Sequence, residues 1–336
     1  MNLFFGIDIS DDLLTGVTVS RNGKESKAVS CAFYQLDEEK QLSKQLPLLL
    51  EELQYSGNGL CDIGLGLSQL SLRNITLPFT ESKKIEQILP FELDEQLLLP
   101  ADQQIIATNT TVVDKEKGET RLVAAALEKK KLAHSLSLLR EQGLEPNKIC
   151  PADFVLAQTL TQTNQESENF IVLSCSISAA TIAVVQHGAV AFMREIPYPT
   201  EIFTESLFFF DGKEIHTQSP DTAEQAVNQL CRTVEQNIDI FSYQFSNNLQ
   251  PDYILLTGSM LLGQGFQEKI SSEIGLPVKQ SNLVQSDTVS LAADIAGQWQ
   301  PELFDRPLAL ALQAAKVGKK NTAFNFRKGE FALPHY

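Results

Sequence analysis

The chain has 336 residues, 43% of them apolar, and this length and composition predict a globular protein with roughly two to four packing units. Its 42 acidic and 27 basic residues give a net charge of −15, which argues against a protein that binds nucleic acid or anionic lipid. The five cysteines are far apart, so neither a zinc site nor a disulfide framework is expected. The histidines are also not spaced as metal ligands are; they are His134, His187, His216 and His335.

The N-terminal segment predicts a three-stranded meander. Met1–Asp8 lacks the basic start of a signal peptide, and no stretch approaches the ~18 apolar residues of a membrane span, so we expect a soluble cytoplasmic chain. β-branched and aromatic residues flank an Asn22-Gly23 turn, which predicts strands at Leu3–Ile9, Leu14–Ser20 and Ala28–Tyr34. A helix at Asp37–Leu53, an apolar run at Asp62–Leu67 and a strand at Ser71–Leu77 follow, and this order is typical of an α/β unit.

Residues Glu81–Cys150 predict a small inserted α+β domain. Its expected elements are a helix at Ser82–Leu89, strands near Ile105–Val113 and Thr120–Leu127, a helix at Lys130–Glu141 and a return strand near Lys148.

The second half repeats the opening plan. Strands are expected at Phe170–Ser174, Ala180–Gln186 and Ala189–Ile196, so that Gly188 corresponds to Gly23 and Ser174 to Asp8. Apolar residues recurring every three or four positions then predict a long helix at Thr222–Phe245. We interpret the repeated meander as an internal duplication.

A strand at Tyr253–Leu256 ends in Thr257-Gly258-Ser259, and a helix is expected directly after it. A residue without Cβ between strand and helix lets backbone amides approach a ligand at the helix N-terminus. Taken alone, this segment is also typical of an ordinary strand-to-helix turn. The next strand is expected at Leu276-Pro277-Val278.

These features together resemble the superfamily of actin, the heat-shock chaperone ATPases and the sugar kinases. In that superfamily two ribonuclease-H-like halves clamp ATP, so the resemblance implies an actin-like α/β fold with duplicated ribonuclease-H-like domains. The small domain inserted in the first half is similar to that of the bacterial cell-division and pilus branch. The implied bounds are 1–80 plus 151–166 for the first domain, 81–150 for the inserted domain, and 167–332 for the second domain with its C-terminal helix and tail.

Two segments carry a closer resemblance. Leu77–Asp94 and Phe324–Ala332 resemble the type II secretion system protein L and its relative, the pilus assembly protein M. In protein L, a segment similar to Asn325–Ala332 closes the cytoplasmic part just before a single membrane span, whereas the pilus protein has no span of its own. Spacing alone also allows a plain C-terminal strand with a surface Arg327-Lys328 pair. We favour protein L, cut before its anchor.

The resemblance identifies the residues of a nucleotide cleft. ATP-using relatives carry Asp-x-Gly in both phosphate loops, where the aspartates position Mg²⁺ through water and the glycines let amides reach phosphate oxygens. Here the loops are Asp8-Ile9-Ser10 and Ser174-Cys175-Ser176, and Thr257-Gly258-Ser259 stands where relatives have paired glycines. One carboxylate of two remains, and Asp11 and Asp12 add negative charge. We therefore expect a degenerate cleft with no catalytic residue, no metal site and at most weak ATP binding.

The leading hypothesis is a non-enzymatic scaffold at the cytoplasmic face of the bacterial inner membrane, which anchors the secretion ATPase to the membrane platform of a type II secretion system. The alternative is an actin-like nucleotide-binding type IV pilus assembly protein, in which Asp8 holds Mg²⁺ and nucleotide changes the angle between the halves. A sugar kinase is disfavoured, because the second meander offers no carboxylate base.

The resemblance implies three kinds of partner, namely the secretion ATPase, other platform proteins and a second copy of the chain in a homodimer. No nucleic acid is expected, and the membrane is contacted only through a span that this chain does not contain. The candidate docking surfaces are an edge strand of the inserted domain, the acidic stretch Glu92–Glu95 and the aromatic cluster Phe208–Phe210, which is alternatively strand core.

Overall fold

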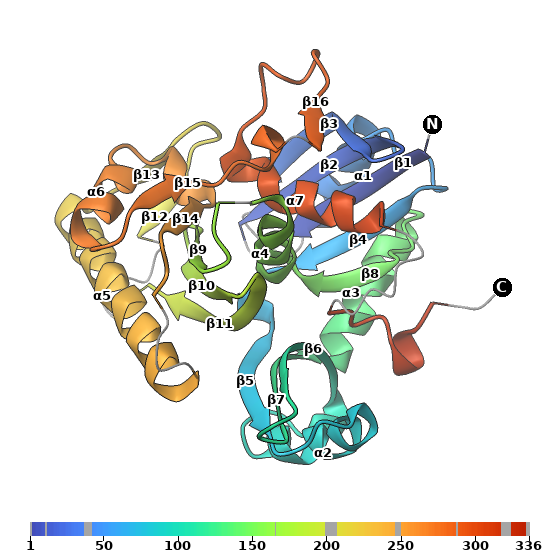
Figure 1. Cartoon of the computed structure of the whole chain (residues 1–336). Coiled ribbons are helices and arrows are strands. Elements are labelled where there is room, and N and C mark those ends of the chain that lie inside the picture. Colours follow the sequence, from blue (N-terminus) through green and yellow to red (C-terminus); the bar gives the residue numbers. More distant parts are fainter. Residues whose placement is uncertain are drawn as a thin grey trace.

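The computed structural model describes residues 2–10, 12–36, 42–164, 166–198, 207–245, 250–286, 288–316 and 324–333. Two halves, each built on its own sheet, lie side by side, and a smaller domain lies beneath them in the view of Figure 1. None of the described helices combines the length and the hydropathy needed to span a membrane.

The first half is built on a six-stranded sheet in the order β16-β3-β2-β1-β4-β8. Its strands are β1 (Asn2–Ile9), β2 (Leu13–Asn22), β3 (Glu25–Gln35), β4 (Leu60–Leu65), β8 (Lys148–Pro151) and β16 (Val289–Leu291). The first three form the expected antiparallel meander, and β4 and β8 extend it in parallel. Gly23 has φ +61° in the turn between β2 and β3, a conformation that glycine adopts without strain.

Helices cover both faces of this sheet. Leu46, Leu49 and Leu50 of α1 (Leu42–Glu52) are buried on the side of β2 and β3, and α7 (Pro301–Ala314) lies across the opposite face (Figure 1). The contact between α7 and β1 is so close that a Cβ on Gly6 would lie 2.0 Å from the carbonyl oxygen of Pro307. Only glycine fits at this position, because the neighbouring atoms are backbone.

The second half repeats this plan in a five-stranded sheet, order β11-β10-β9-β14-β15. Its strands are β9 (Phe170–Cys175), β10 (Ala179–Gln186), β11 (Ala189–Pro197), β14 (Ile254–Thr257) and β15 (Val278–Gln280). Again an antiparallel meander is extended by two parallel strands, so β9 takes the place of β1. The duplicated actin-like α/β architecture expected from the sequence is therefore confirmed.

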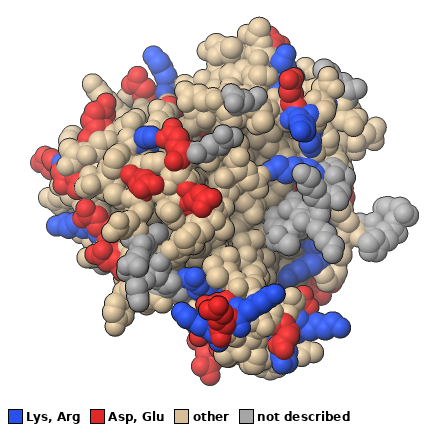
Figure 2. Space-filling model, in the orientation of Figure 1, with Lys and Arg blue, Asp and Glu red and all other residues tan. Residues whose placement is uncertain are grey.

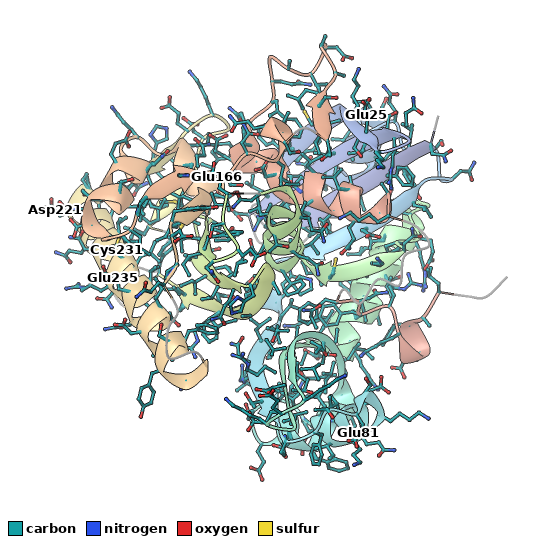
Figure 3. All side chains as sticks on the ribbon, in the orientation of Figure 1. Glu25, Glu81, Glu166, Asp221, Cys231 and Glu235 are labelled. Carbon is teal, nitrogen blue, oxygen red and sulfur yellow. The ribbon has the colours of Figure 1, made fainter. Side chains whose placement is uncertain are left out.

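The long helix α5 (Pro220–Phe245) and the shorter α6 (Phe266–Glu273) cover one face of the second sheet (Figure 1). Figure 3 labels residues of α5, where Cys231 is buried and Glu235 is exposed, as expected for a helix with a single apolar face. A short hairpin, β12 (Phe208–Phe210) with β13 (Ile215–Thr217), adjoins this layer. Figure 2 shows many acidic side chains on this half of the molecule.

The helix expected directly after Thr257-Gly258-Ser259 begins later. A single helical turn at Ser259–Leu262 comes first, and α6 starts only at Phe266. The reason lies in the glycines, because Gly258 has φ +100° and Gly265 has φ +75°, values that interrupt a right-handed helix.

The small domain has a three-stranded sheet in the order β5-β7-β6, formed by β5 (Ser71–Leu77), β6 (Gln104–Asp114) and β7 (Glu119–Glu128). Alternate residues of β7 face two helices: Leu122 and Ala124 belong to the same cluster as residues of α2 (Ser82–Asp94), whereas Val123 and Ala125 cluster with residues of α3 (Lys129–Glu141).

The sheet pairings place some segments differently from the domain bounds expected from the sequence. β5, expected within 1–80, pairs with β7 in the small domain, and β8, whose first residues were expected within 81–150, pairs with β4 in the first half. β16 and α7 belong to the chain of the second half but lie on the first sheet. The apolar stripe of α7 is buried there because Gly6 opens the sheet face to it.

The helix α4 (Ala152–Thr163) lies between the halves and contacts both sheets and α7. Its side chains Phe154, Val155 and Leu156 belong to one continuous apolar cluster that runs from the first sheet to Phe170 and Val172 of β9. This shared core fixes the two phosphate loops relative to each other.

The C-terminal segment, residues 324–333, packs against the first half. Phe324 and Phe326 are fully buried, and the backbone N–H of Phe326 donates to the carbonyl oxygen of Ile149 at 2.8 Å. The guanidinium of Arg327 is buried, 2.5 Å from the carboxylate of Glu145 and 3.0 Å from the carbonyl oxygen of Pro146. A surface Arg327-Lys328 pair is therefore wrong for Arg327, whose side chain is buried and is held by the Glu145 carboxylate and by the carbonyl oxygens of Pro146 and Phe331.

Candidate functional site

The two expected phosphate loops face each other between the halves. Asp8 and Ser10 lie at the end of β1, and Ser174 and Ser176 lie at the end of β9. Ser10, Ser174 and Ser176 line one cavity of about 30 Å³, and Asp8 is 1% exposed beside it. This volume holds about one or two water molecules. The structure thus brings these four residues together around a space far smaller than the ~300 Å³ or more of a typical ligand pocket.

Arg306 fills the space between the loops, a position that the sequence analysis did not predict. The residue belongs to α7 and precedes Pro307, whose carbonyl oxygen lies against Gly6. Because Gly6 has no Cβ, the backbone of α7 comes close to β1, and the guanidinium of Arg306 reaches the end of that strand. The position of the cation therefore follows from the packing of the helix.

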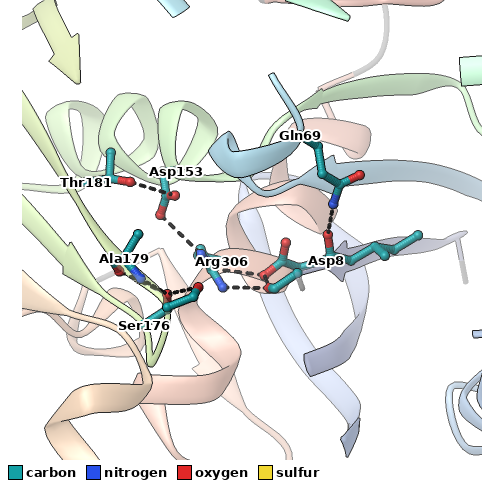
Figure 4. A network of polar contacts seen from close by, with 10 residues as sticks. Asp8, Gln69, Asp153, Ser176, Ala179, Thr181 and Arg306 are labelled. Carbon is teal, nitrogen blue, oxygen red and sulfur yellow. Dashed lines mark hydrogen bonds and ion pairs between the residues drawn. The ribbon is translucent and has the colours of Figure 1, made fainter. Parts of the chain in front are cut away.

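Three side chains hold the guanidinium (Figure 4). Arg306 Nε lies 2.9 Å from Asp8 Oδ2, Nη2 donates to Ser10 Oγ at 2.9 Å, and Nη1 lies 3.3 Å from Asp153 Oδ1. Ser10 Oγ in turn donates to Asp8 Oδ2 at 3.2 Å. Asp8 and Ser10 come from the first loop and Asp153 from the start of α4, so the arginine links three elements of the first half.

Burial dominates the electrostatics of this cluster. It raises the pKa of Asp8 to about 6, although the neighbouring Arg306 guanidinium acts in the opposite direction. For Arg306, burial lowers the pKa, but the surrounding carboxylates of Asp8, Asp153 and Asp12 outweigh it, so the pKa is raised. The negative charge expected around Asp12 is therefore offset by the guanidinium of Arg306, whose side chain is 18% exposed. Asp11, expected beside it, lies outside the described residues.

Asp153 is a second site residue that the sequence analysis missed. It lies in the first turn of α4, is 5% exposed, and its Oδ2 accepts a hydrogen bond from Thr181 Oγ1 of β10 at 3.3 Å. Asp153 thus connects Arg306 in the first half to a strand of the second half. A signal was available, because Asp153 is an acidic residue between the apolar strand β8 and an otherwise apolar helix turn.

The serines of the second loop have different surroundings. Ser176 Oγ donates to the carbonyl oxygen of Ala179 at 2.9 Å and accepts from the N–H of Ala179 at 3.3 Å, so it closes its own turn. Ser174 pairs in register with Thr181 on one side and Thr257 on the other, and it is 5% exposed. Neither hydroxyl binds Arg306 in the contacts of the described residues.

The third expected loop, Thr257-Gly258-Ser259, lies behind β9 and does not line the cavity. Gly258 has φ +100°, and a Cβ there would lie 2.3 Å from the carbonyl oxygen of Cys175. The glycine is therefore required for the packing of β14 against β9. Thr257 and Ser259 are both buried, and the hydroxyl of Ser259 has no hydrogen-bond partner among the described residues.

A second cavity, of about 270 Å³, lies beyond this turn. It is lined mainly by apolar residues of β12 and β13, of α5 and of the segment Met260–Phe266. Between this region and the first half, Gln35 Nε2 donates to the carbonyl oxygen of Phe210 at 2.6 Å, and the rings of Phe33 and Phe210 are 5.8 Å apart. The hairpin β12–β13 is therefore tied to the first sheet, and Phe208 is buried whereas Phe209 is 41% exposed.

The buried carboxyl of Asp305, next to Arg306, should make the stability of the fold depend on pH. Its Oδ2 accepts hydrogen bonds from Ser281 Oγ at 3.0 Å and from the N–H of Leu283 at 3.3 Å, but burial raises its pKa to about 8. A carboxyl with a folded-state pKa above its unfolded value stabilises the fold when protonated, and this contribution is lost as the pH rises through the folded-state value. Burial also raises the pKa values of Asp8 and Asp62, but only to about 6.

We therefore expect the melting temperature to fall between pH 6.5 and pH 8.5, and the fall to be smaller in Asp305→Asn. The loss should correspond to about 1–3 kcal/mol, since one pKa unit is worth about 1.4 kcal/mol. Calorimetry across this range measures it, with Asp221→Asn on exposed helix surface as the matched control. Equal slopes in the native chain and in Asp305→Asn would contradict the assignment.

The family model of type II secretion system protein L matches residues 18–188, slightly more than half of the chain. The chain belongs to this family. Membership confirms the resemblance carried by Leu77–Asp94 and makes the chain a component of a type II secretion system. A search by sequence among curated proteins finds no match.

Solved structures show the fold that this family member shares. The PilM-PilN type IV pilus biogenesis complex aligns with a TM-score of 0.76 at 19% identity, over 93% of this chain and 98% of that chain. The cytoplasmic domain of EpsL, an inner membrane component of the type II secretion system of Vibrio cholerae, aligns with a TM-score of 0.52 at 14% identity, over 98% of this chain and 100% of that one. A Bacteroides thetaiotaomicron protein with an actin-like ATPase fold and unknown function aligns with a TM-score of 0.50 at 13% identity, over 94% and 95%.

Proposed function

We propose that this protein is a non-enzymatic scaffold of a type II secretion system, which recruits the secretion ATPase to the inner-membrane platform from the cytoplasmic side. The observation that carries the proposal is Arg306, which fills the space between the two phosphate loops and is held there by Asp8, Ser10 and Asp153. The location is supported by the Vibrio cholerae relative EpsL, an inner membrane component with a cytoplasmic domain.

The residues of the cleft do not fit a magnesium nucleotide. Phosphoryl transfer depends on backbone amides and cations placed around the phosphates, and a bound Mg²⁺ needs free carboxylate oxygens. Asp8 Oδ2 is engaged by Arg306 and Ser10, and although Asp8 Oδ1 has no hydrogen-bond partner among the described residues, the charge of this carboxylate is already balanced by the guanidinium beside it. Ser10 and Ser176 place side chains where superfamily loops have glycine. The remaining cavity of about 30 Å³ has no room for a triphosphate.

We expect isothermal titration of the purified chain with ATP and Mg²⁺ to give no binding tighter than about 1 mM, a free energy of about −4 kcal/mol. The double variant Ser174→Asp, Ser176→Gly restores the second loop, yet it should also fail to bind, because Arg306 still fills the space between the loops. ATP turnover should stay at the buffer background in both proteins. Micromolar binding by the native chain would refute the proposal for the cleft.

A nucleotide-switched assembly factor is the second candidate. Its support is the fold that the chain shares with the PilM-PilN type IV pilus biogenesis complex. The same titration separates the two functions, because binding that requires the phosphates would favour the switch.

Recruitment of the secretion ATPase needs an experiment of its own, separate from the titration of the cleft with ATP. We expect the purified chain to bind the secretion ATPase of its own system in the absence of nucleotide, and addition of ATP should leave the affinity unchanged. We also propose that the chain associates with other platform proteins and forms a homodimer, which sedimentation at increasing concentration measures.

A further inference from the structure

The first two turns of α7 bind the second half as well as the first. The helix packs across the first sheet, yet Asp305 Oδ2 accepts hydrogen bonds from Ser281 Oγ at 3.0 Å and from the N–H of Leu283 at 3.3 Å. Ser281 directly follows β15, and its own N–H donates to the carbonyl oxygen of Leu256 in β14 at 2.9 Å. A helix that lies on the first sheet is therefore tied to the second sheet through one carboxyl group.

Arg306, the next residue, leads to a second tie. Asp8 and Ser10 anchor its guanidinium in the first loop, and the same group lies 3.3 Å from Asp153 Oδ1. The other oxygen, Asp153 Oδ2, accepts from Thr181 Oγ1 of β10 at 3.3 Å (Figure 4). The two oxygens of Asp153 thus bond to opposite halves. We name the following five residues the interdomain clasp: Asp305, Arg306, Asp153, Ser281 and Thr181.

Water has little access to the bonds of the interdomain clasp. The carboxyls of Asp153 and Asp305 and the hydroxyls of Thr181 and Ser281 belong to buried residues, none of which is more than 6% exposed. The cavity beside them holds only about one or two water molecules. A rotation of one half against the other would remove these donors from two buried carboxyls, and such a loss costs free energy.

The apolar cluster around α4 also runs across both halves, but it fixes their angle less sharply. Packed helices can slide past one another by small amounts, which is one way in which domains move. A hydrogen bond between a carboxyl and a hydroxyl needs a particular distance and direction, and it is lost when the donor moves by about 1 Å. The clasp therefore restricts rotations that the apolar core alone would permit.

We propose that the interdomain clasp holds the two halves at one fixed angle, with or without nucleotide in solution, so that the protein is a rigid scaffold. This goes beyond the proposed function, because a chain that binds no nucleotide could still have halves that open and close. It also bears on the alternative, because a nucleotide-switched factor needs halves that rotate. The bonds of the clasp join side chains and backbone of this one chain.

Hydrogen exchange of the full chain tests the clasp, because it detects openings that are rarely populated. The double variant Thr181→Val, Ser281→Ala removes both hydroxyls that the second half contributes. We expect the amides of residues 174–181 and 281–286 to exchange at least about tenfold faster, since two hydrogen bonds to buried carboxyls are lost. The slowest amides of β6 and β7 in the small domain should change by less than about twofold, because the opening is confined to the cleft.

The matched control is Thr159→Val, Ser242→Ala. It removes the same two kinds of hydroxyl, but Thr159 Oγ1 donates to the carbonyl oxygen of Val155 within α4, and Ser242 Oγ donates to that of Ile238 within α5. Exchange at the cleft should stay within about twofold of the native chain in this control. If the clasp variant exchanges like the control, the clasp does not hold the halves and the proposal is overturned. Equally faster exchange at the cleft and in the small domain would assign the two hydroxyls to general stability, which also overturns it.

The distance between spin labels at Glu25→Cys and Glu235→Cys tests the independence from nucleotide. Both positions are exposed and lie in different halves (Figure 3), and all five native cysteines are buried. We expect one narrow distance distribution that ATP and Mg²⁺ leave unchanged. A broad or double distribution without ATP would overturn the clasp alone, and a distance that changes with ATP would overturn both the clasp and the proposed function. ATP binding without a change in distance would overturn the proposed function for the cleft and support the clasp.

Discussion

Replacing Arg306 with methionine is expected to cost about 3–5 kcal/mol of unfolding free energy at pH 7.5. The change removes the cation but leaves Asp8, 1% exposed, and Asp153, 5% exposed, in the same space. A buried ion pair that loses one partner leaves an uncompensated charge, and this costs far more than the net contribution of the pair itself. Urea denaturation of Arg306→Met and the native chain measures the difference.

Two further measurements separate the charge effect from lost packing. Adding Asp8→Asn and Asp153→Asn to Arg306→Met should recover most of the stability, because no charge then remains unpaired. The cost of Arg306→Met alone should also shrink at pH 5, since the pKa of Asp8 is already about 6 in the native chain and rises further without the guanidinium. If Arg306→Met alone loses less than about 1 kcal/mol of unfolding free energy at pH 7.5, Arg306 does not neutralise the charge of Asp8 in the first loop.

The meander residues show why the fold could be predicted from the sequence. The turns at Gly23 and Gly188 both have positive φ, so glycine marks the same place in each half, and the runs of β-branched and other apolar residues on either side of these turns define the strands. Asp8 and Ser174 lie at matching strand ends for the same reason. These are local signals, and they determine the order and direction of neighbouring strands.

Arg306 could not be placed from local signals. Its contact with Asp8 joins residues almost three hundred positions apart, and it depends on the depth to which α7 packs against Gly6. Still, the sequence contains a hint, because Asp305 and Arg306 are adjacent ionisable residues in a helix whose buried residues are mostly apolar; Asp305 is buried and the Arg306 side chain is only 18% exposed. Charged residues within a buried helix need partners, so such a pair predicts a polar site even where its location is unknown.

The second large loss of unfolding free energy is expected from a variant in the C-terminal segment, residues 324–333. Phe326→Ala should cost about 3 kcal/mol, because it empties a fully buried aromatic site and weakens the hydrogen bond between Phe326 and Ile149. Arg327→Met should cost about 1–2 kcal/mol, since it leaves the carbonyl oxygens of Pro146 and Phe331 without their donor, whereas the Glu145 carboxylate is 41% exposed and keeps its ion pair with Arg140. Phe331→Ala, at the half-buried end of the segment, should cost less than about 1 kcal/mol and serves as the control.

The double variant Phe326→Ala, Arg327→Met decides whether the segment binds as one unit. Phe324 stacks edge-on against Phe154 of α4 with ring centroids 4.5 Å apart, and Glu330 pairs with Lys129 of α3 at 3.6 Å, so the segment links the first half to the small domain. If either single change releases the whole segment, the second change has little left to remove. We therefore expect a double-variant cost well below the sum of the single costs, and a fully additive result in urea denaturation would mean that each residue holds its own site independently.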